Sequence, residues 1–368
     1  MKITCLKSEL LSGLNIAMRA VPSKTSYSIL ESFLLYAYED CISVTASDNE
    51  MIIETKIPGI IEEEGMIAVD ARLFTEIIRK LPENNVSVIT DARFRILIKC
   101  EDIEMVLNGK DPDEFPRRPE IKKDDVISIS QFTLKEIVRQ TIFSVSGNDS
   151  GSIMRGELFE IKENVLKVIS LDSHRISIRY ANLSENFGFI KRIIPGKCLL
   201  EVSRIINGNI EDKTEIVFDN NFVQFSFNDT VVLSRLIEGE FVDVENMISM
   251  DYETEVKINK NLLMSCIERS MTLVREGEKK PVILDIRDDI MNIDLRSSLG
   301  ELNEQIFLER KEGNDQLIGF NPKYILDVLR VIDDEVIDMY FLHTNAPCFI
   351  RNREEEYVYI ILPININR

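Results

Sequence analysis

A helix-and-strands pattern that occurs three times is the feature that most constrains how this chain folds. In the second half of each copy, an amphipathic stretch of about ten residues is followed by three short strand-like segments split by turn residues. These three stretches begin at Ala71, Gly196 and Asn321. The copies are evenly spaced, because Leu73 precedes Cys198 by 125 residues and Cys198 precedes Tyr324 by 126. This spacing predicts repeated domains of one design.

The first half of each copy has its own amphipathic helix. The three helices fall within residues 6–21, 130–145 and 259–274. A short alternating segment precedes each helix, and pairs of alternating strands follow it. The predicted fold class is therefore α+β, with two helices packed on antiparallel sheets in each domain. The predicted domains are residues 1–121, 122–249 and 250–368.

The composition argues against several classes of protein. Apolar residues make up 44% and charged residues 29%, which is typical of a globular chain with ample core. No apolar run approaches the roughly 18 residues of a membrane span, and the N-terminus lacks a signal-peptide pattern, so we expect a cytoplasmic protein with no membrane partner. The six cysteines show no CxxC spacing and there are only two histidines, which predicts buried thiols, no metal site and no cofactor.

Charge is unevenly distributed along this chain, whose net charge is −19. An evenly acidic protein would be a poor match for nucleic acid. In the six helical stretches, however, basic side chains outnumber acidic ones, so the remainder is more acidic still. If the helices share one surface, that surface is basic and suits a polyanion; the alternative is that each helix has an ordinary solvated face. No base-reading motif is present, so any DNA contact is expected to be directed at the backbone.

Motifs along the whole chain resemble those of the bacterial DNA polymerase III beta subunits, the sliding clamp family. They are SDNEMIIETKIP at 47–58, MRGELFE at 154–160, SLDSHR at 170–175, GEFVD at 239–243, GFNPKYILDVL at 319–329 and YIILPI at 359–364. Each motif alone is weak, but their order and spacing together are specific. The resemblance implies three clamp domains in a ring-shaped, head-to-tail homodimer. It also implies a non-catalytic processivity factor of the replicative polymerase that encircles duplex DNA without sequence specificity.

The resemblance implies residues for DNA contact and for closure of the ring. Positions that correspond to DNA contacts of the family are Lys24, Arg72 and Lys197, and further basic candidates on the helices are Arg79, Lys135, Arg139 and Arg204. The ring would close where the segment 100–108, with Met105 and Leu107, meets the helix end at Thr272 and Leu273. Pairing a long edge strand within a closed dimer removes an aggregation liability.

The family also has an apolar pocket between its second and third domains. This pocket receives short linear peptides from the catalytic (alpha) subunit of the replicative polymerase, other polymerases, the clamp loader and mismatch-repair proteins. Its counterparts in domain two are Met154, Leu171, Ser173, His174, Arg175 and Ile176. The other counterparts are Val242, Met247, Asn321, Tyr324, Pro347, Ile360, Ile361, Leu362, Pro363 and Ile364. Apolar walls with a few polar groups suit an extended peptide anchored by Leu and Phe.

Three departures from the family pattern bear on this pocket, and one bears on DNA. A common proline is Val242 here, and two common arginines are Asn246 and Asn365. The preference for partner peptides is therefore expected to be shifted. A tyrosine pair that contacts DNA in some members is replaced by Ser152 and Ile153, which argues against that contact in this chain.

An enzymatic alternative would use Asp172 and His174 as an acid–base pair. On a strand, D-x-H spacing places both side chains on one face. No nucleophile, phosphate-binding or metal motif accompanies the pair. Asp48 lies 124 residues before Asp172 with no histidine beside it, so a recurrent turn-forming aspartate is the simpler interpretation.

A second alternative is a scaffold that binds peptides but not DNA. It shares the pocket prediction and differs only in its behaviour on DNA. A clamp is retained on circular duplex after loading and released when the circle is cut, whereas a peptide scaffold is never retained.

Overall fold

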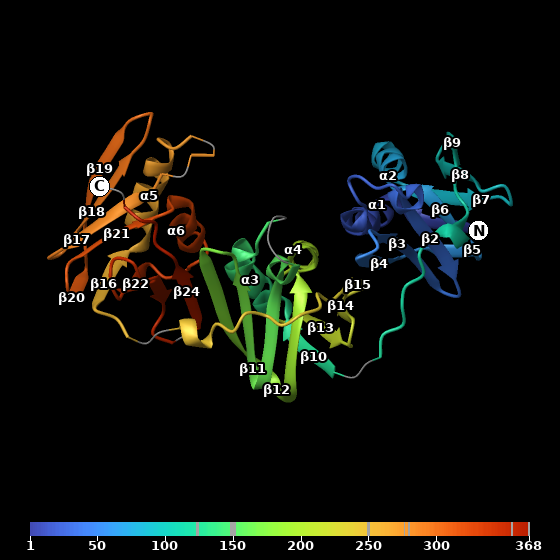
Figure 1. Cartoon of the computed structure of the whole chain (residues 1–368). Coiled ribbons are helices and arrows are strands. Elements are labelled where there is room, and N and C mark those ends of the chain that lie inside the picture. The colour runs from blue at the N-terminus through green and yellow to red at the C-terminus, as the bar shows by residue number, and fades with distance from the viewer. Residues whose placement is uncertain are drawn as a thin grey trace. The chain divides into compact units, whose positions relative to one another are not determined.

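The computed structural model describes residues 1–122, 125–147, 152–248, 251–275, 277–278, 280–354 and 356–366, apart from the side chains of Asp125, Ser152 and Asn246. The chain forms two compact units, Met1–Phe132 with Lys197–Leu236, and Thr133–Gly196 with Ile237–Arg368 (Figure 1). The chain therefore passes between the units three times, near the starts of the third and fourth helices and after Leu236. We call them the first and second unit.

All six helices predicted from the repeat are present among the described residues. They are α1 (Lys7–Ala17), α2 (Ala71–Lys80), α3 (Gln131–Thr141), α4 (Gly196–Ile205), α5 (Lys260–Met271) and α6 (Pro322–Leu329). Side-chain oxygens cap three of them at the N-terminus: Asp70 accepts from Leu73 N at 2.8 Å, and Asn259 and Asn321 act in the same way on α5 and α6. Such caps satisfy backbone donors that have no partner inside the helix.

The first unit contains two antiparallel sheets. The five-stranded sheet has the order β5 (Ile60–Glu63), β1 (Lys2–Leu6), β7 (Asn85–Thr90), β8 (Arg95–Cys100), β9 (Ile103–Asn108). The eight-stranded sheet has the order β10 (Asp125–Ser130), β13 (Lys213–Phe218), β14 (Phe222–Phe227), β15 (Thr230–Arg235), β4 (Met51–Ile57), β3 (Cys41–Ser47), β2 (Ser32–Tyr38), β6 (Gly65–Asp70).

The second unit also contains two antiparallel sheets. The seven-stranded sheet has the order β11 (Gly156–Leu171), β12 (Arg175–Pro195), β24 (Tyr357–Ile361), β23 (Cys348–Arg351), β22 (Val336–Phe341), β16 (Thr254–Asn259), β20 (Arg310–Gly313). The four-stranded sheet has the order β19 (Glu301–Phe307), β18 (Ile290–Arg296), β17 (Val282–Arg287), β21 (Gln316–Phe320).

Strand pairing joins one repeat to the next inside each unit. The last strand of the second repeat, β15, pairs with β4 of the first repeat, and Ser234 lies opposite Met51. The last strand of the third repeat, β24, pairs with β12 of the second, and Ile361 lies opposite Arg175. The same two kinds of strand are used at both joints. The last strand of the first repeat, β9, and the counterpart of β4 and β12 in the third repeat, β19, are edge strands.

The helices cover the sheets with the apolar faces that the sequence predicts. Leu10 and Leu14 of α1 and Phe74 and Ile78 of α2 are fully buried, as are the corresponding residues of α5 and α6. All six cysteines are free thiols; five are buried, but Cys41 is partly exposed, which corrects the expectation of six buried thiols. No helix in the described part of the chain is long and apolar enough to cross a membrane.

Candidate functional site

A cavity of about 520 Å³ lies within the second unit. It is lined by Met154, Leu171, Asp172, Ser173, Arg175, Ile176, Val242, Met247, Leu342, Pro347, Phe349, Ile360 and Leu362. Most of these side chains are apolar, and the few polar groups come from one turn and one arginine. This combination suits a ligand with apolar anchors and a polar backbone.

Five segments of the second repeat, the connector and the third repeat line the cavity. The end of β11 and the start of β12 contribute Leu171 and Ile176, and the connector before β16 contributes Val242 and Met247. The remaining walls come from β22 to β24 and the residue after β24, Leu362. Because β12 pairs with β24, segments far apart in the sequence are held side by side at this site.

The apolar wall continues into a buried cluster that fixes its position. Leu171, Phe349 and Ile360 belong to a core cluster shared by β11, β12, the connector and β24, and Met154 and Val242 pack against it. Met247 and Leu362 are 48% and 40% exposed. The floor of the cavity is therefore rigid core, and its rim consists of accessible apolar side chains that a ligand could cover.

Arg175 is the only buried arginine lining the cavity, and its side chain is 8% exposed. Its guanidinium pairs with Asp172 at 3.0 Å and Asp327 of α6 at 2.6 Å, and donates to the Phe143 carbonyl. The guanidinium carbon also lies 4.6 Å from the ring centroid of Tyr324. Burial raises the pKa of the Tyr324 hydroxyl above its ordinary value. A buried guanidinium with this many partners holds the surrounding side chains in place. Removing one partner would leave a buried charge without compensation.

Asp172 and His174 lie in a turn, as the interpretation of Asp172 as a turn former predicts, and they do not share the strand face that the enzymatic alternative requires. The turn lies between β11 and β12, and Asp172 Oδ1 accepts from the backbone N–H groups of His174 and Arg175 at 2.8 and 3.1 Å. The other carboxylate oxygen pairs with the Arg175 guanidinium. The His174 ring instead packs on Tyr324, with centroids 5.7 Å apart. The carboxylate is committed to the turn and is not oriented toward the imidazole.

The first repeat contains the same turn, as the recurrent aspartate predicts. Asp48 Oδ1 accepts from the N–H groups of Glu50 and Met51 at 3.0 and 2.7 Å, and Asp48 N donates to Met51 O at 3.1 Å. In the second repeat, Asp172 N donates to Arg175 O at 3.1 Å. A short acceptor side chain that bonds amides two and three residues on stabilises a tight turn. Asp172 is thus a turn former whose second oxygen holds Arg175.

The remaining predicted pocket residues lie around the cavity and do not line it. Tyr324 and His174 support Arg175 from outside, Asn321 caps α6, and Ile361 is in the core. The tail after β24 is tied down because Leu362 N donates to His174 O and Ile364 N to Gly319 O, both at 2.8 Å. The predictions missed Asp172, Leu342 and Phe349 as lining residues. Phe349 follows the predicted Pro347 by two residues, which could have indicated it.

The departures from the family pattern fall in different environments. Val242 lines the cavity, and Ile153 packs against the cluster behind it. Asn365 is exposed. The side chains of Asn246 and Ser152 lie outside the described residues.

The DNA-contact candidates of the first unit lie on or next to helices and mostly have acidic neighbours. Lys24 is exposed. Arg72 donates to the carbonyls of Pro22 and Ser23, the two residues that precede Lys24. Lys197 pairs with Asp48. Arg79 pairs with Glu76, and Arg204 pairs with Glu201 at 2.7 Å. The cation of each pair is at least half exposed, although Asp48 and Glu201 are largely buried, so phosphate oxygens can reach all three cations.

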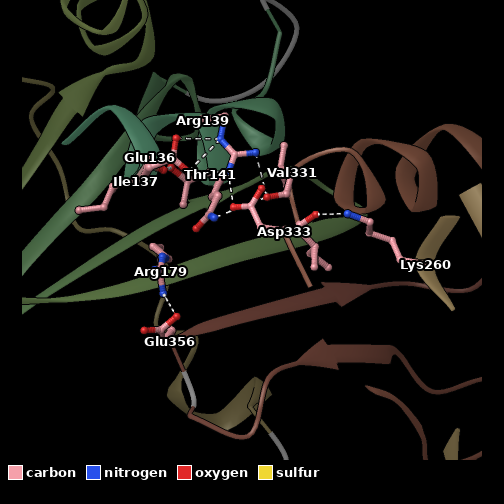
Figure 2. Close-up of polar contacts among 11 residues, drawn as sticks. Glu136, Ile137, Arg139, Thr141, Arg179, Lys260, Val331, Asp333 and Glu356 are labelled. Atoms are coloured by element: carbon pink, nitrogen blue, oxygen red, sulfur yellow. Dashed lines mark hydrogen bonds and ion pairs between the residues drawn. The ribbon is translucent and has the colours of Figure 1, made fainter. Parts of the chain in front are cut away.

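Arg139 in the second unit has a structural role that the sequence did not indicate. Figure 2 shows its guanidinium between Glu136 of α3 and the chain that follows α6. It pairs with Asp333 at 2.7 Å and donates to Val331 O at 3.1 Å, while Lys260 Nζ donates to the next carbonyl, of Ile332, at 2.7 Å. Cations at the C-terminal end of a helix complement its dipole. Lys135, the other candidate here, also has a polar partner.

The residues predicted for closure of a dimer lie at exposed edges. Met105 and Leu107 are on β9, an edge strand whose residues are mostly exposed. Thr272 is exposed at the end of α5, and Leu273 packs partly against the core of the second unit. The edge strand β19 close to this helix end was not anticipated. A Cβ built on Gly300, just before β19, would lie 3.6 Å from Leu273.

No group of three or more His, Cys, Asp or Glu side chains that could hold a metal occurs among the described residues. The candidate acid–base pair is not assembled, and the cavity contains no nucleophile paired with a base.

Three family models match this chain in sequence order. The N-terminal domain of the DNA polymerase III beta subunit matches residues 1–119, the central domain 128–243 and the C-terminal domain 245–365.

Curated relatives and solved structures match the chain over almost its full length. The beta sliding clamps of Staphylococcus aureus and Bacillus subtilis are each 32% identical to it, with 99% of both chains covered. A crystal structure of the sliding clamp from Bacillus subtilis superposes with a TM-score of 0.97 at 32% identity. A DNA polymerase III beta subunit structure from Eubacterium rectale does so with a TM-score of 0.97 at 47% identity; each of these two superpositions covers 100% of both chains.

Proposed function

We propose that two copies of this chain close head to tail around duplex DNA, because the chain belongs to the DNA polymerase III beta subunit family and is a non-catalytic sliding clamp of DNA replication. The catalytic subunit of the replicative polymerase, the clamp loader, other polymerases and mismatch-repair proteins would then dock through the cavity lined by Arg175 and Leu362. Because a clamp works where the chromosome is replicated, we place it in the cytoplasm.

The observation that carries the closure is the use of the same strand pairing at both joints of the chain. Each joint pairs the last strand of one repeat with the strand after the acidic turn of another, β15 with β4 and β24 with β12. The remaining strands of these two kinds are β9 and β19, and both are edges. A third joint of the same kind between two copies pairs β9 with β19 twice, and a two-fold dimer closes both edges.

The register of this joint follows from the other two. Each repeat has an equivalent turn closed by a backbone hydrogen bond. Asp48 N donates to the Met51 carbonyl in the first repeat, Asp172 N to the Arg175 carbonyl in the second, and Ser297 N to the Gly300 carbonyl in the third. Opposite Met51 and Arg175 are Ser234 and Ile361, which lie 127 residues apart, and 127 residues before Ser234 is Leu107. Leu107 is therefore expected opposite Gly300 of the partner copy.

This register brings apolar side chains together, which supports it. The two strands of an antiparallel pair run in opposite directions. Two residues away from the Leu107–Gly300 pair, Met105 is therefore expected opposite Leu302. Met105 is 41% exposed in the single chain, and Leu302, like Leu273, packs partly buried against the core of the second unit. Both apolar side chains would lose solvent in the dimer, as the predicted contact of Met105 and Leu107 with Thr272 and Leu273 requires.

DNA contact through Lys24, Arg72, Arg79, Lys135, Lys197 and Arg204 remains a proposal and rests on their basic charge and, for all but Lys24, on their helical positions. Arg139 supports it less, because its guanidinium has two carboxylates and a carbonyl as partners. Contacts of this kind go to phosphates, so binding is expected to be independent of base sequence and strongly dependent on salt.

Retention on circular DNA tests the proposal directly. The protein is loaded onto nicked circular duplex with a clamp loader and separated from free protein by gel filtration. Retention that is lost when a restriction enzyme linearises the circle supports a closed clamp. Release before cutting, or the same retention on open linear duplex, would contradict it and favour a scaffold that binds peptides alone. A monomer at micromolar concentration by light scattering would also count against closure.

A further inference from the structure

An exposed aromatic patch lies on the outer face of the eight-stranded sheet in the first unit, and the sliding-clamp function does not account for it. It consists of Tyr36 and Tyr38 of β2 and Met66 of β6, which are 38%, 48% and 44% exposed. The two rings stack with centroids 6.0 Å apart and planes 13° apart, and Tyr36 lies directly opposite Met66 in the sheet. Three large apolar side chains are thus contiguous on one surface.

The other repeats show that the fold does not require apolar residues here. The strand pairs that lead into α2, α4 and α6 have matching registers, with Tyr36 opposite Met66, Glu160 opposite Lys191 and Asp285 opposite Leu317. In the second repeat, Glu160 and Lys191 form an ion pair at 3.8 Å.

The third repeat has charged residues on the matching strand as well. Asp285 pairs there with Arg287, the counterpart of Tyr38, at 2.8 Å. The equivalent surface is an ordinary charged sheet face in two repeats, so the aromatic version in the first repeat needs its own explanation. Exposed apolar patches of this kind mark sites of association.

The rim of the patch is acidic. Glu39 and Asp40 form the turn directly after Tyr38, and Glu64 precedes β6. All three side chains are exposed, and Glu64 is placed beside the turn because its carboxylate accepts from Glu39 N at 2.9 Å. The chain as a whole carries a net charge of −19, which adds a long-range attraction for cations.

We propose that this patch, formed by Tyr36, Tyr38 and Met66 with the acidic rim of Glu39, Asp40 and Glu64, is a second docking surface for a partner protein. The fitting segment carries arginine next to an aromatic or large aliphatic side chain. Guanidinium groups stack on tyrosine faces and pair with carboxylates, and the apolar neighbour covers Met66. The surface goes beyond the proposed clamp function, since it belongs to the first unit and the cavity to the second.

Methionine methyl NMR can test this site separately from the cavity. The chain has 12 methionines, so ¹³C-methyl spectra contain few signals, and the ring current of a tryptophan in the probe shifts the methyl signals that it approaches. The probe is a short blocked peptide of alternating arginine and tryptophan, titrated into the intact protein. The expected result is a saturable shift of the Met66 methyl signal, while the exposed Met247 of the cavity does not move.

Two variants and one control decide the outcome. Replacing Tyr36→Glu together with Tyr38→Lys copies the residues of the second repeat and should weaken binding by about tenfold or more, the usual loss for an aromatic anchor. Glu39→Gln with Glu64→Gln should weaken it and remove its salt dependence. The control Phe189→Ser changes another exposed aromatic and should have no effect. An unmoved Met66 signal, or Met66 shifts that persist in the Tyr36 and Tyr38 variant, would overturn the proposal.

Discussion

Glu157 is the residue whose chemistry is least expected from its position. It is fully buried, and neither carboxylate oxygen has a hydrogen-bond partner among the described residues. The nearby Thr141 hydroxyl donates to Ile137 O at 2.7 Å and so has no proton to offer. In the matching registers of the other repeats, Phe33 and Val282 occupy the same position. Burial raises the pKa of Glu157 from 4.5 to about 8.

This raised pKa predicts that Glu157→Gln stabilises the protein at neutral and alkaline pH. Between pH 4.5 and 8 the unfolded state loses the proton that the folded state keeps, so stability falls as pH rises through that window. The amide removes a penalty on the order of 3 kcal/mol at pH 7 and almost none at pH 4. Scanning calorimetry should show a higher Tm for the variant at pH 8 and no difference at pH 4.

The matched control is Glu160→Gln on the same strand, since Glu160 faces outward and pairs with Lys191. It should not gain stability with rising pH. A Tm difference for Glu157→Gln that is the same at pH 4 and pH 8 would show that ionisation of this carboxyl is not the cause.

Arg175 is expected to be essential for peptide binding because its guanidinium holds several residues around the cavity in place. Arg175→Lys should weaken binding of a peptide with Leu and Phe anchors by about tenfold or more, because an ammonium cannot hold Asp172, Asp327 and a carbonyl in a planar fork. Fluorescence anisotropy with a labelled peptide measures the change in affinity. The control Arg330→Lys changes a surface cation of the same unit, paired with Glu268, and should bind normally. Equal affinities for all three proteins would refute this role.

At the scale of elements, the open question is whether β9 and β19 of two copies pair. In the double variant Met105→Cys with Leu302→Cys, mild oxidation should give covalently linked dimers, visible on a non-reducing gel. The thiols would lie directly opposite each other in the register given by the other two joints. The background variant Cys41→Ser removes the only native cysteine that is not buried.

The out-of-register control is Glu104→Cys with Leu302→Cys. One residue along a strand reverses the face, so this pair should not cross-link. Linking of the control but not of the Met105 pair would show that the register is wrong. Linking of neither, in a protein that is dimeric by light scattering, would show that another surface closes the dimer.

The six helices were predictable as elements because an apolar stripe at helical spacing is a local signal. Leu10 and Leu14, or Phe74 and Ile78, recur at intervals of four and are buried as expected. The turn at Asp48 and Asp172 was predictable for the same reason, since an aspartate bonds its own neighbours. The same turn removes the strand geometry that the enzymatic alternative needs for Asp172 and His174, because β11 ends at Leu171 and β12 begins at Arg175.

At the scale of the whole molecule, we expect charge to determine how the chain meets DNA. Arg72→Gln with Lys197→Gln should reduce the salt dependence of duplex binding. The log–log slope should fall by about 0.9 for each phosphate that the protein no longer neutralises. Anisotropy of a labelled duplex over a series of salt concentrations gives the slope. The control Lys162→Gln removes an exposed cation from β11 and should leave the slope unchanged. A slope that stays the same in the double variant would exclude both residues from DNA binding.

The sequence by itself determined the repeated design, the helices and the family, because each rests on local periodicity or on motifs read in order. Ten of the predicted pocket residues also line the cavity, since family motifs carry their positions. The tertiary structure decided which residues meet: that Arg175 reaches Asp327, that Arg139 is used at the end of α6, and that β15 and β24 cross from one repeat to another. The physical reason is that helix periodicity and turns depend on neighbours in the chain, whereas partners across a sheet or a helix end depend on how distant segments pack.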